Sequence, residues 1–238
     1  MDASEVGSGA PPRLEAVERE LRAPWAAGVA GLVFATLFSV SMVLFYREPK
    51  AGSSASEIAA WYLRDRGTAI GFVGVYLTPF AGIAFLWFVA TVRSRIGARE
   101  DKFFATVFLG GGILFVALLY AAAAAISAPL AAVKFQDAPP PSADVFVYAR
   151  GLAYTLLFVY GMRAAAVFMI VSSTIALRTA ALPRWVAYLG FAVALVLLFS
   201  VSYVRAIVFT FPAWVALVSI VALRRAHAER ERPPARDT

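Results

Sequence analysis

The apolar residues of this chain fall into blocks of about twenty instead of alternating with polar ones. Because a helix needs about 20 apolar residues to cross the hydrocarbon of a bilayer, this pattern predicts an all-α polytopic membrane protein. Charged or proline-containing segments separate the blocks. We expect six transmembrane helices, at about 25–46, 69–92, 104–126, 150–177, 185–204 and 208–223.

The polar ends of the chain flank a transmembrane domain at 25–223. Residues 1–24 are polar and predict a solvated N-terminal tail, with a short surface helix as the alternative. Residues 224–238 predict a basic, disordered C-terminal tail.

A short amphipathic helix is predicted between the first two spans. Ser54 and Glu57 have the spacing of a capping box. In the helix that follows, Ile58, Trp61 and Tyr62 share one face. We expect this external helix to lie on the membrane surface and pack against the bundle, and the alternative is a lid over the bundle.

Proline and glycine mark other features of the spans. Pro79 is expected to kink the second span. The run Gly110–Gly112 favours close packing of the third span against its neighbours. Residues 127–144 contain Pro139–Pro141 and predict a loop at the external surface.

The fourth apolar segment, 145–177, is the longest single one. As a helix of about 33 residues it would be near 50 Å long, against roughly 30 Å of hydrocarbon. We therefore expect its first two turns to project outside, with Arg150 on them. Arg163 is then expected in the outer third of the hydrocarbon layer.

Residues 185–223 contain about 39 mostly apolar residues, which is too many for one crossing and enough for two. We expect a tight turn near Arg205–Phe211, with Pro212 at the start of the sixth span.

Composition agrees with a membrane protein. Hydrophobic residues make up 61% of the 238 residues and mean hydropathy is +0.74, whereas a soluble domain is about 45–50% apolar. The excess of Arg over Lys and the abundance of Ala suggest a bacterial origin. The chain has no cysteine, which excludes disulfides, and its one histidine, His227, lies in the C-terminal tail.

The net charge of +7 indicates orientation and contact with anionic headgroups, and not a nucleic-acid partner, since the basic residues flank the spans. One side of the predicted membrane carries about 14 Lys and Arg residues and the other about seven. This predicts a protein of the bacterial inner membrane with both termini cytoplasmic.

The predicted spans contain few groups for catalysis. No Asp or Glu lies inside them, and their serines have no His or Lys nearby to activate them. We therefore expect no enzymatic activity, no cofactor and no metal site.

Arg163 is the costly residue of the spans, because a charge in hydrocarbon costs about 2.5 kcal/mol or more. One hypothesis is that Arg163 and Tyr160 bind an anionic group such as a lipid phosphate or carboxylate. Arg150, Arg205 and Tyr203 would assist at the outer mouth. The alternative is structural: Arg163 snorkels to the external interface or donates to the carbonyls of adjacent helices.

The layout resembles a loosely defined group of bacterial six-helix membrane proteins of unknown function. The resemblance rests on SASEIAAWYLRDRG before the second span, RSRIGARE after it and LPRWVAYLGF at the start of the fifth. It covers most of the chain and implies the topology, but it brings no catalytic residues.

Two functions are weighed on this basis. The first is a noncatalytic accessory or scaffold subunit, associated with a partner membrane protein or a second copy, or a binder of an amphipathic anionic ligand such as a lipid. The alternative is a small transporter or permease component for an anionic or lipidic solute. A polar cavity reaching Arg163 would favour transport, and a filled, dry core would favour the first.

Overall fold

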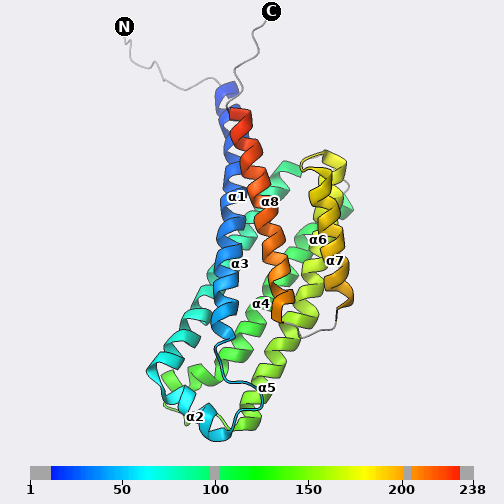
Figure 1. Ribbon diagram of the computed structural model, residues 1–238. Helices are drawn as coiled ribbons and strands as arrows, with labels where there is room; N and C mark the ends of the chain where they lie inside the picture. The colour runs from blue at the N-terminus through cyan, green and yellow to red at the C-terminus, as the bar shows by residue number, and fades with distance from the viewer. Residues whose placement is uncertain (1–11, 97–101, 201–204, 231–238) are drawn as a thin grey trace, which may run out of the picture.

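The computed structural model describes residues 12–96, 102–200 and 205–230. The protein is all-helical, with 88% of it in helices, and the described residues contain no strand (Figure 1). The elements are α1 (Pro12–Phe45), α2 (Ala55–Leu63), α3 (Asp65–Ile96), α4 (Lys102–Phe135), α5 (Ala143–Tyr154), the π-helix η2 (Thr155–Gly161), α6 (Met162–Thr179), α7 (Arg184–Phe199), the 3-10 helix η3 (Arg205–Phe209) and α8 (Thr210–Arg230).

The long helices form an up-and-down bundle in which successive helices run in opposite directions (Figure 1). α1 lies beside α3 and α8, α4 packs between α3 and α6, and α7 packs on α6. The start of α1 and the end of α8 therefore lie at the same end of the bundle, drawn at the top of Figure 1.

Five helical segments are long and apolar enough to cross a membrane. They are Trp25–Phe45, Gly74–Arg93, Phe103–Phe135, Ala143–Thr179 and Arg205–Ala228. The fifth expected span, 185–204, corresponds to α7, which has 16 residues and a length of about 24 Å. Five long apolar helices are thus confirmed, whereas the expected count of six is not.

Several helices extend beyond their expected ends. α1 begins at Pro12, so half of the segment expected as a tail continues the first helix, and α8 continues to Arg230 instead of ending at 223. α4 continues through Pro129 to Phe135, so the loop expected at 127–144 is wrong for its first half. Proline inside a helix removes one backbone hydrogen bond and strains the preceding turn, and the burial of the flanking residue Leu130 against α2 and α5 favours the continued helix.

A small second core lies at the end of the bundle opposite to the start of α1 and the end of α8 (Figure 1). Ile58 and Tyr62 of α2 pack on Leu130 of α4 and Phe146 of α5, and Trp61 joins them. We call α2 and the parts of α4 and α5 that it contacts the distal cap. The capping box is confirmed, since Ser54 Oγ accepts from the Glu57 amide and the Glu57 carboxylate accepts from the Ser54 amide.

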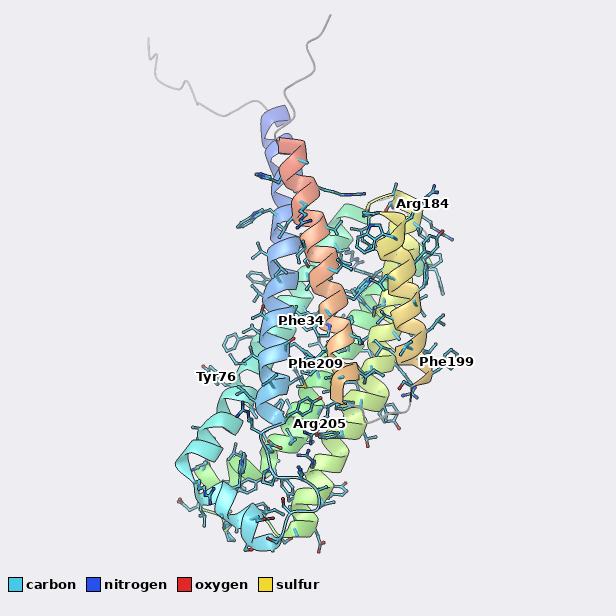
Figure 2. The ribbon with its side chains drawn as sticks, viewed as in Figure 1. Phe34, Tyr76, Arg184, Phe199, Arg205 and Phe209 are labelled. Atoms are coloured by element: carbon cyan, nitrogen blue, oxygen red, sulfur yellow. The ribbon has the colours of Figure 1, made fainter. Side chains whose placement is uncertain are left out.

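The centre of the main bundle is filled by phenylalanine side chains. Phe34 of α1 lies 4.7 Å from Phe85 of α3, and Phe115 of α4 lies 4.8 Å from Phe211 of α8, measured between ring centroids. Phe168 of α6 joins this group through Phe85 at 5.2 Å. Figure 2 shows Phe34 in the middle of the bundle. Interlocking rings from five helices leave the core packed and apolar.

Glycines set close contacts between neighbouring helices. A side chain at Gly82 of α3 would collide with Tyr120 of α4. The Tyr120 hydroxyl instead donates to the Pro79 carbonyl at 2.8 Å. This hydrogen bond joins α3 to α4 at the proline where a kink was expected. Gly111 and Gly112 face Phe168, which agrees with the expected packing role of the glycine run.

The expected fourth segment is confirmed as one continuous helical stretch, Ala143–Thr179. The sequence did not predict that its middle turn and a half is a π-helix, η2. A π-helix accommodates an extra residue and widens the backbone locally. It separates Arg150 on α5 from Arg163 on α6.

Candidate functional site

Arg163 lies one residue after the N-terminal end of α6 and is half-buried. Its Nη1 donates to the carbonyl oxygen of Val159 at 2.6 Å. Val159 is one turn nearer the distal cap, so the side chain extends toward that end of its own helix, as helical side chains generally do. The structural alternative expected carbonyls of adjacent helices, whereas this acceptor belongs to the same helical stretch as Arg163.

A groove runs between α4 and the η2–α6 helix, and Arg163 lines it. The groove has a volume of about 530 Å³. One wall is an α4 face and the other is the face of η2 and α6 that carries Tyr160 and Arg163. The lining residues are Val107, Gly110, Gly111, Leu114, Leu118, Tyr160, Arg163, Ala164 and Val167.

Arg150 occupies a different site. It lies 13 residues before Arg163, about 20 Å along the helix axis. Its Nη1 donates to the carbonyl oxygen of Pro49 at 3.1 Å, and its Nη2 donates to the Tyr154 hydroxyl at 2.8 Å. The guanidinium also lies 4.8 Å from the centre of the Tyr154 ring. Arg150 thus ties α5 to the segment between α1 and α2.

A buried carboxylate faces Arg150. Oε2 of Glu48 lies 3.7 Å from Nη1 of Arg150, and each side chain is less than a tenth exposed. This distance is too long for a hydrogen bond, and Oε2 has no other partner among the described residues. Burial raises the pKa of the Glu48 carboxyl to about 8, and the Arg150 charge offsets this only in part.

Arg205 lies at the start of η3 (Figure 2). Its guanidinium lies 5.1 Å from the centre of the Tyr46 ring, and its carbonyl oxygen accepts from the Tyr46 hydroxyl at 3.0 Å. These contacts join the end of α1 to the start of η3. Tyr203, the other residue expected at the outer mouth, lies outside the described residues.

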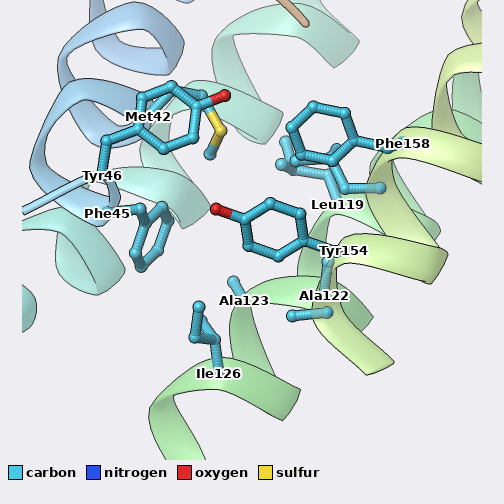
Figure 3. Close-up of a pocket in the computed structure, with 11 residues that line it drawn as sticks. Met42, Phe45, Tyr46, Leu119, Ala122, Ala123, Ile126, Tyr154 and Phe158 are labelled. Atoms are coloured by element: carbon cyan, nitrogen blue, oxygen red, sulfur yellow. The ribbon is translucent and has the colours of Figure 1, made fainter. Parts of the chain in front are cut away.

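A small apolar pocket lies between the two arginine–tyrosine pairs. Figure 3 shows Tyr46 of the α1 end opposite Tyr154 of α5, with Phe158 and Leu119 beside them. Its volume is about 30 Å³, which is room for one or two water molecules. The pocket is therefore too small for an organic ligand.

The expected site residues are thus divided between two places. Arg163 and Tyr160 lie on the groove, whereas Arg150 and Arg205 lie at the junction between the bundle and the distal cap. Sequence reasoning missed Glu48, which we had treated as an ordinary connector residue. Its partner is 102 positions away, and the only local signal was its place directly after the first span.

The groove and the junction differ in chemistry. At the junction, the arginines already have protein partners, so the contacts there hold segments together. The groove has an apolar surface, and Arg163 is one of the residues that line it. Searches against protein-family models, curated proteins and solved structures gave no match to this chain.

Proposed function

We propose that this protein is a noncatalytic integral membrane protein that crosses the bilayer six times and binds an anionic amphipathic ligand such as a lipid. The observation that carries the ligand is Arg163. It lies within one of the apolar segments, Ala143–Thr179, and among the described residues no carboxylate pairs with it. Charged residues at such depth are costly and mark binding or conduction pathways more often than not.

Six crossings are supported by the arrangement of the helices. α7 runs beside α6 in the opposite direction, with Arg184 and Phe199 at its two ends (Figure 2). α8 then returns toward the end where α1 starts. With α7 as a crossing, the basic connectors and both chain ends fall on one side, which the positive-inside rule makes cytoplasmic.

The packed phenylalanine core favours a binder or scaffold over the transporter alternative. Transport of an anion requires a polar path that opens through the bundle. Phe34, Phe85 and Phe211, which are fully buried and mutually in contact, occupy the centre instead. A ligand is therefore expected on the outside of the bundle and not in a central channel.

Native mass spectrometry after mild detergent extraction tests this function. The expected result is a protein ion that retains anionic phospholipid in excess of its share of the surrounding membrane. Retention of a protein partner or a second copy without lipid would support the scaffold function instead. Protein ions without bound lipid at the mildest activation would contradict the proposal.

A further inference from the structure

The groove beside Arg163 has a regular construction from two helix faces. On α4, its lining residues are spaced three or four apart, as in Val107, Gly110 and Leu114. On the other wall, Tyr160, Arg163 and Val167 repeat at the same spacing. Residues at this spacing form one continuous stripe along a helix. The groove is therefore elongated and runs parallel to the helices.

Its length suits a single hydrocarbon chain. From Val107 to Leu118 the α4 wall spans 11 residues, which is about 16 Å. Half the hydrocarbon thickness of a bilayer is about 15 Å. An acyl chain reaching from one interface to the midplane covers the same length. Gly110 gives the groove part of its depth, since a side chain added there would meet nothing within 4 Å.

The positive charge of Arg163 favours an anionic ligand. A guanidinium has five N–H donors, and the structure gives Arg163 one acceptor, the Val159 carbonyl. Hydrocarbon offers the remaining donors no acceptor. The contact with Val159 shows that the side chain extends toward the preceding turn, on the side of Tyr160.

We propose that this groove binds one acyl chain of an anionic membrane lipid, with the acidic group of the lipid on Arg163. The inference rests on the proposed function and names its site. The chain lies along the apolar walls toward Val107 and Val167, and the acidic group accepts hydrogen bonds from the guanidinium. Arginine suits this role because its planar fork donates two bonds to one phosphate or carboxylate.

A second copy of this chain fits the groove less well. A partner helix would need a carboxylate at the depth of Arg163. The apolar segments that the structure describes contain one acidic residue, Asp144, and it lies in the first turn of α5, far from that depth. The charge of the groove is therefore complementary to a lipid and not to this protein.

Two variants separate the charge from the shape of the groove. Arg163→Leu removes the cation and keeps the walls, whereas Gly110→Leu keeps the cation and fills the groove. Gly151→Leu is the matched control, because Gly151 lies on α5 away from the groove and also has open space around it. Melting temperatures of all variants in the same detergent show whether each protein is folded.

The measurement uses nanodiscs that contain phosphatidylglycerol and phosphatidylcholine, followed by native mass spectrometry of the released protein. We expect wild type and Gly151→Leu to retain phosphatidylglycerol preferentially. Arg163→Leu should lower its retention about tenfold or more, because both charge-assisted hydrogen bonds to the acidic group are lost. Gly110→Leu should lower the retention of both lipids.

Each other outcome is decisive. If wild type retains phosphatidylglycerol and both groove variants retain as much, the lipid lies elsewhere and the site is wrong, although the proposed function stands. If only Arg163→Leu loses lipid, filling the groove with Gly110→Leu has no effect, and the acyl chain does not bind in the groove. If wild type itself shows no preference for the anionic lipid, both the site and the proposed function fail.

Discussion

Glu48 is the residue at which burial and charge conflict most strongly. Its carboxyl is buried beside Arg150 of α5. Burial and, to a smaller extent, the nearby Glu48 carboxylate raise the pKa of the Tyr62 hydroxyl. The Tyr46 and Arg205 pair lies nearby. Desolvation outweighs the attraction of Arg150, so the folded protein holds a neutral Glu48 more readily than a charged one.

This predicts a pH dependence of stability with a definite sign. The pKa of Glu48 rises from an ordinary 4.5 to about 8 on folding, so the folded state binds the proton more tightly than the unfolded state. The neutral carboxyl makes its full contribution to the free energy of unfolding below about pH 4.5, and this contribution is lost as pH rises through 8. The apparent melting temperature in detergent should therefore fall between pH 6 and pH 9.

The control is Glu48→Gln, which keeps the shape and removes the titration. Its melting temperature should change less than that of wild type over the same pH range. A wild-type melting temperature that rises with pH, or that follows the variant at every pH, would show that Glu48 ionises normally.

Arg150 should matter for stability more at high pH than at low pH. Arg150→Met removes the hydrogen bonds of the guanidinium to the Pro49 carbonyl and the Tyr154 hydroxyl, which should cost about 2–3 kcal/mol of the free energy of unfolding. At pH 9 the variant also leaves an ionised Glu48 without its cation, so the cost should grow. Denaturation of both proteins at pH 6 and pH 9 measures this, and an equal cost at the two values would contradict it.

At the scale of elements, contacts between helices depend on small residues at particular crossings. Gly190 of α7 faces both the Ser173 side chain of α6 and the Trp214 side chain of α8. A side chain added at Gly190 would overlap the Ser173 hydroxyl and press on the Trp214 ring. Since α7 packs mainly on α6, this crossing positions the whole helix.

Gly190→Leu should therefore destabilise the protein by about 2 kcal/mol, as overpacking typically does. For a chain of this length this corresponds to a fall of about 5 °C in melting temperature. Gly151→Leu, at an open position in α5, should change the melting temperature little. Equal effects of the two substitutions would mean that the α6–α7 contact is not tight.

The sequence predicted which segments are helical better than where the helices end. Blocks of apolar residues locate the long helices because hydrophobicity is a local property of the chain. The extension of α4 through Pro129 depends on Leu130 packing on α2 and Phe146, which are distant in sequence. The π-helix also has no signal in apolar periodicity, because one extra residue in a uniformly apolar run leaves no mark.

The candidate site was predicted in part for the same reason. Arg163 and Tyr160 were identifiable because they stand out in, or beside, an apolar run, and the structure brings them together on one groove. Grouping Arg150 and Arg205 with them was an expectation that the helix geometry does not support, since Arg150 is about 20 Å away along the axis. Glu48 was recognisable only once Arg150 was placed next to it.

At the scale of the whole molecule, the arrangement of long apolar helices around a phenylalanine core makes a specific topological claim. If all six helices cross, the distal cap and the α7–η3 connection lie on one side of the membrane. The α6–α7 connection and the end of α8 lie on the other, together with the start of α1 (Figure 1). α7 decides the count, because it is the shortest of the six.

Single-cysteine labelling in intact bacterial cells measures this directly, because the natural chain contains no cysteine. Four exposed positions serve as reporters: Gly52, Ala181, Ala206 and Ala228. With a membrane-impermeant maleimide, Gly52→Cys and Ala206→Cys should react in intact cells, and Ala181→Cys and Ala228→Cys only after the membrane is opened. If Ala181→Cys and Ala206→Cys react from the same side, α7 does not cross and the six-span account is wrong.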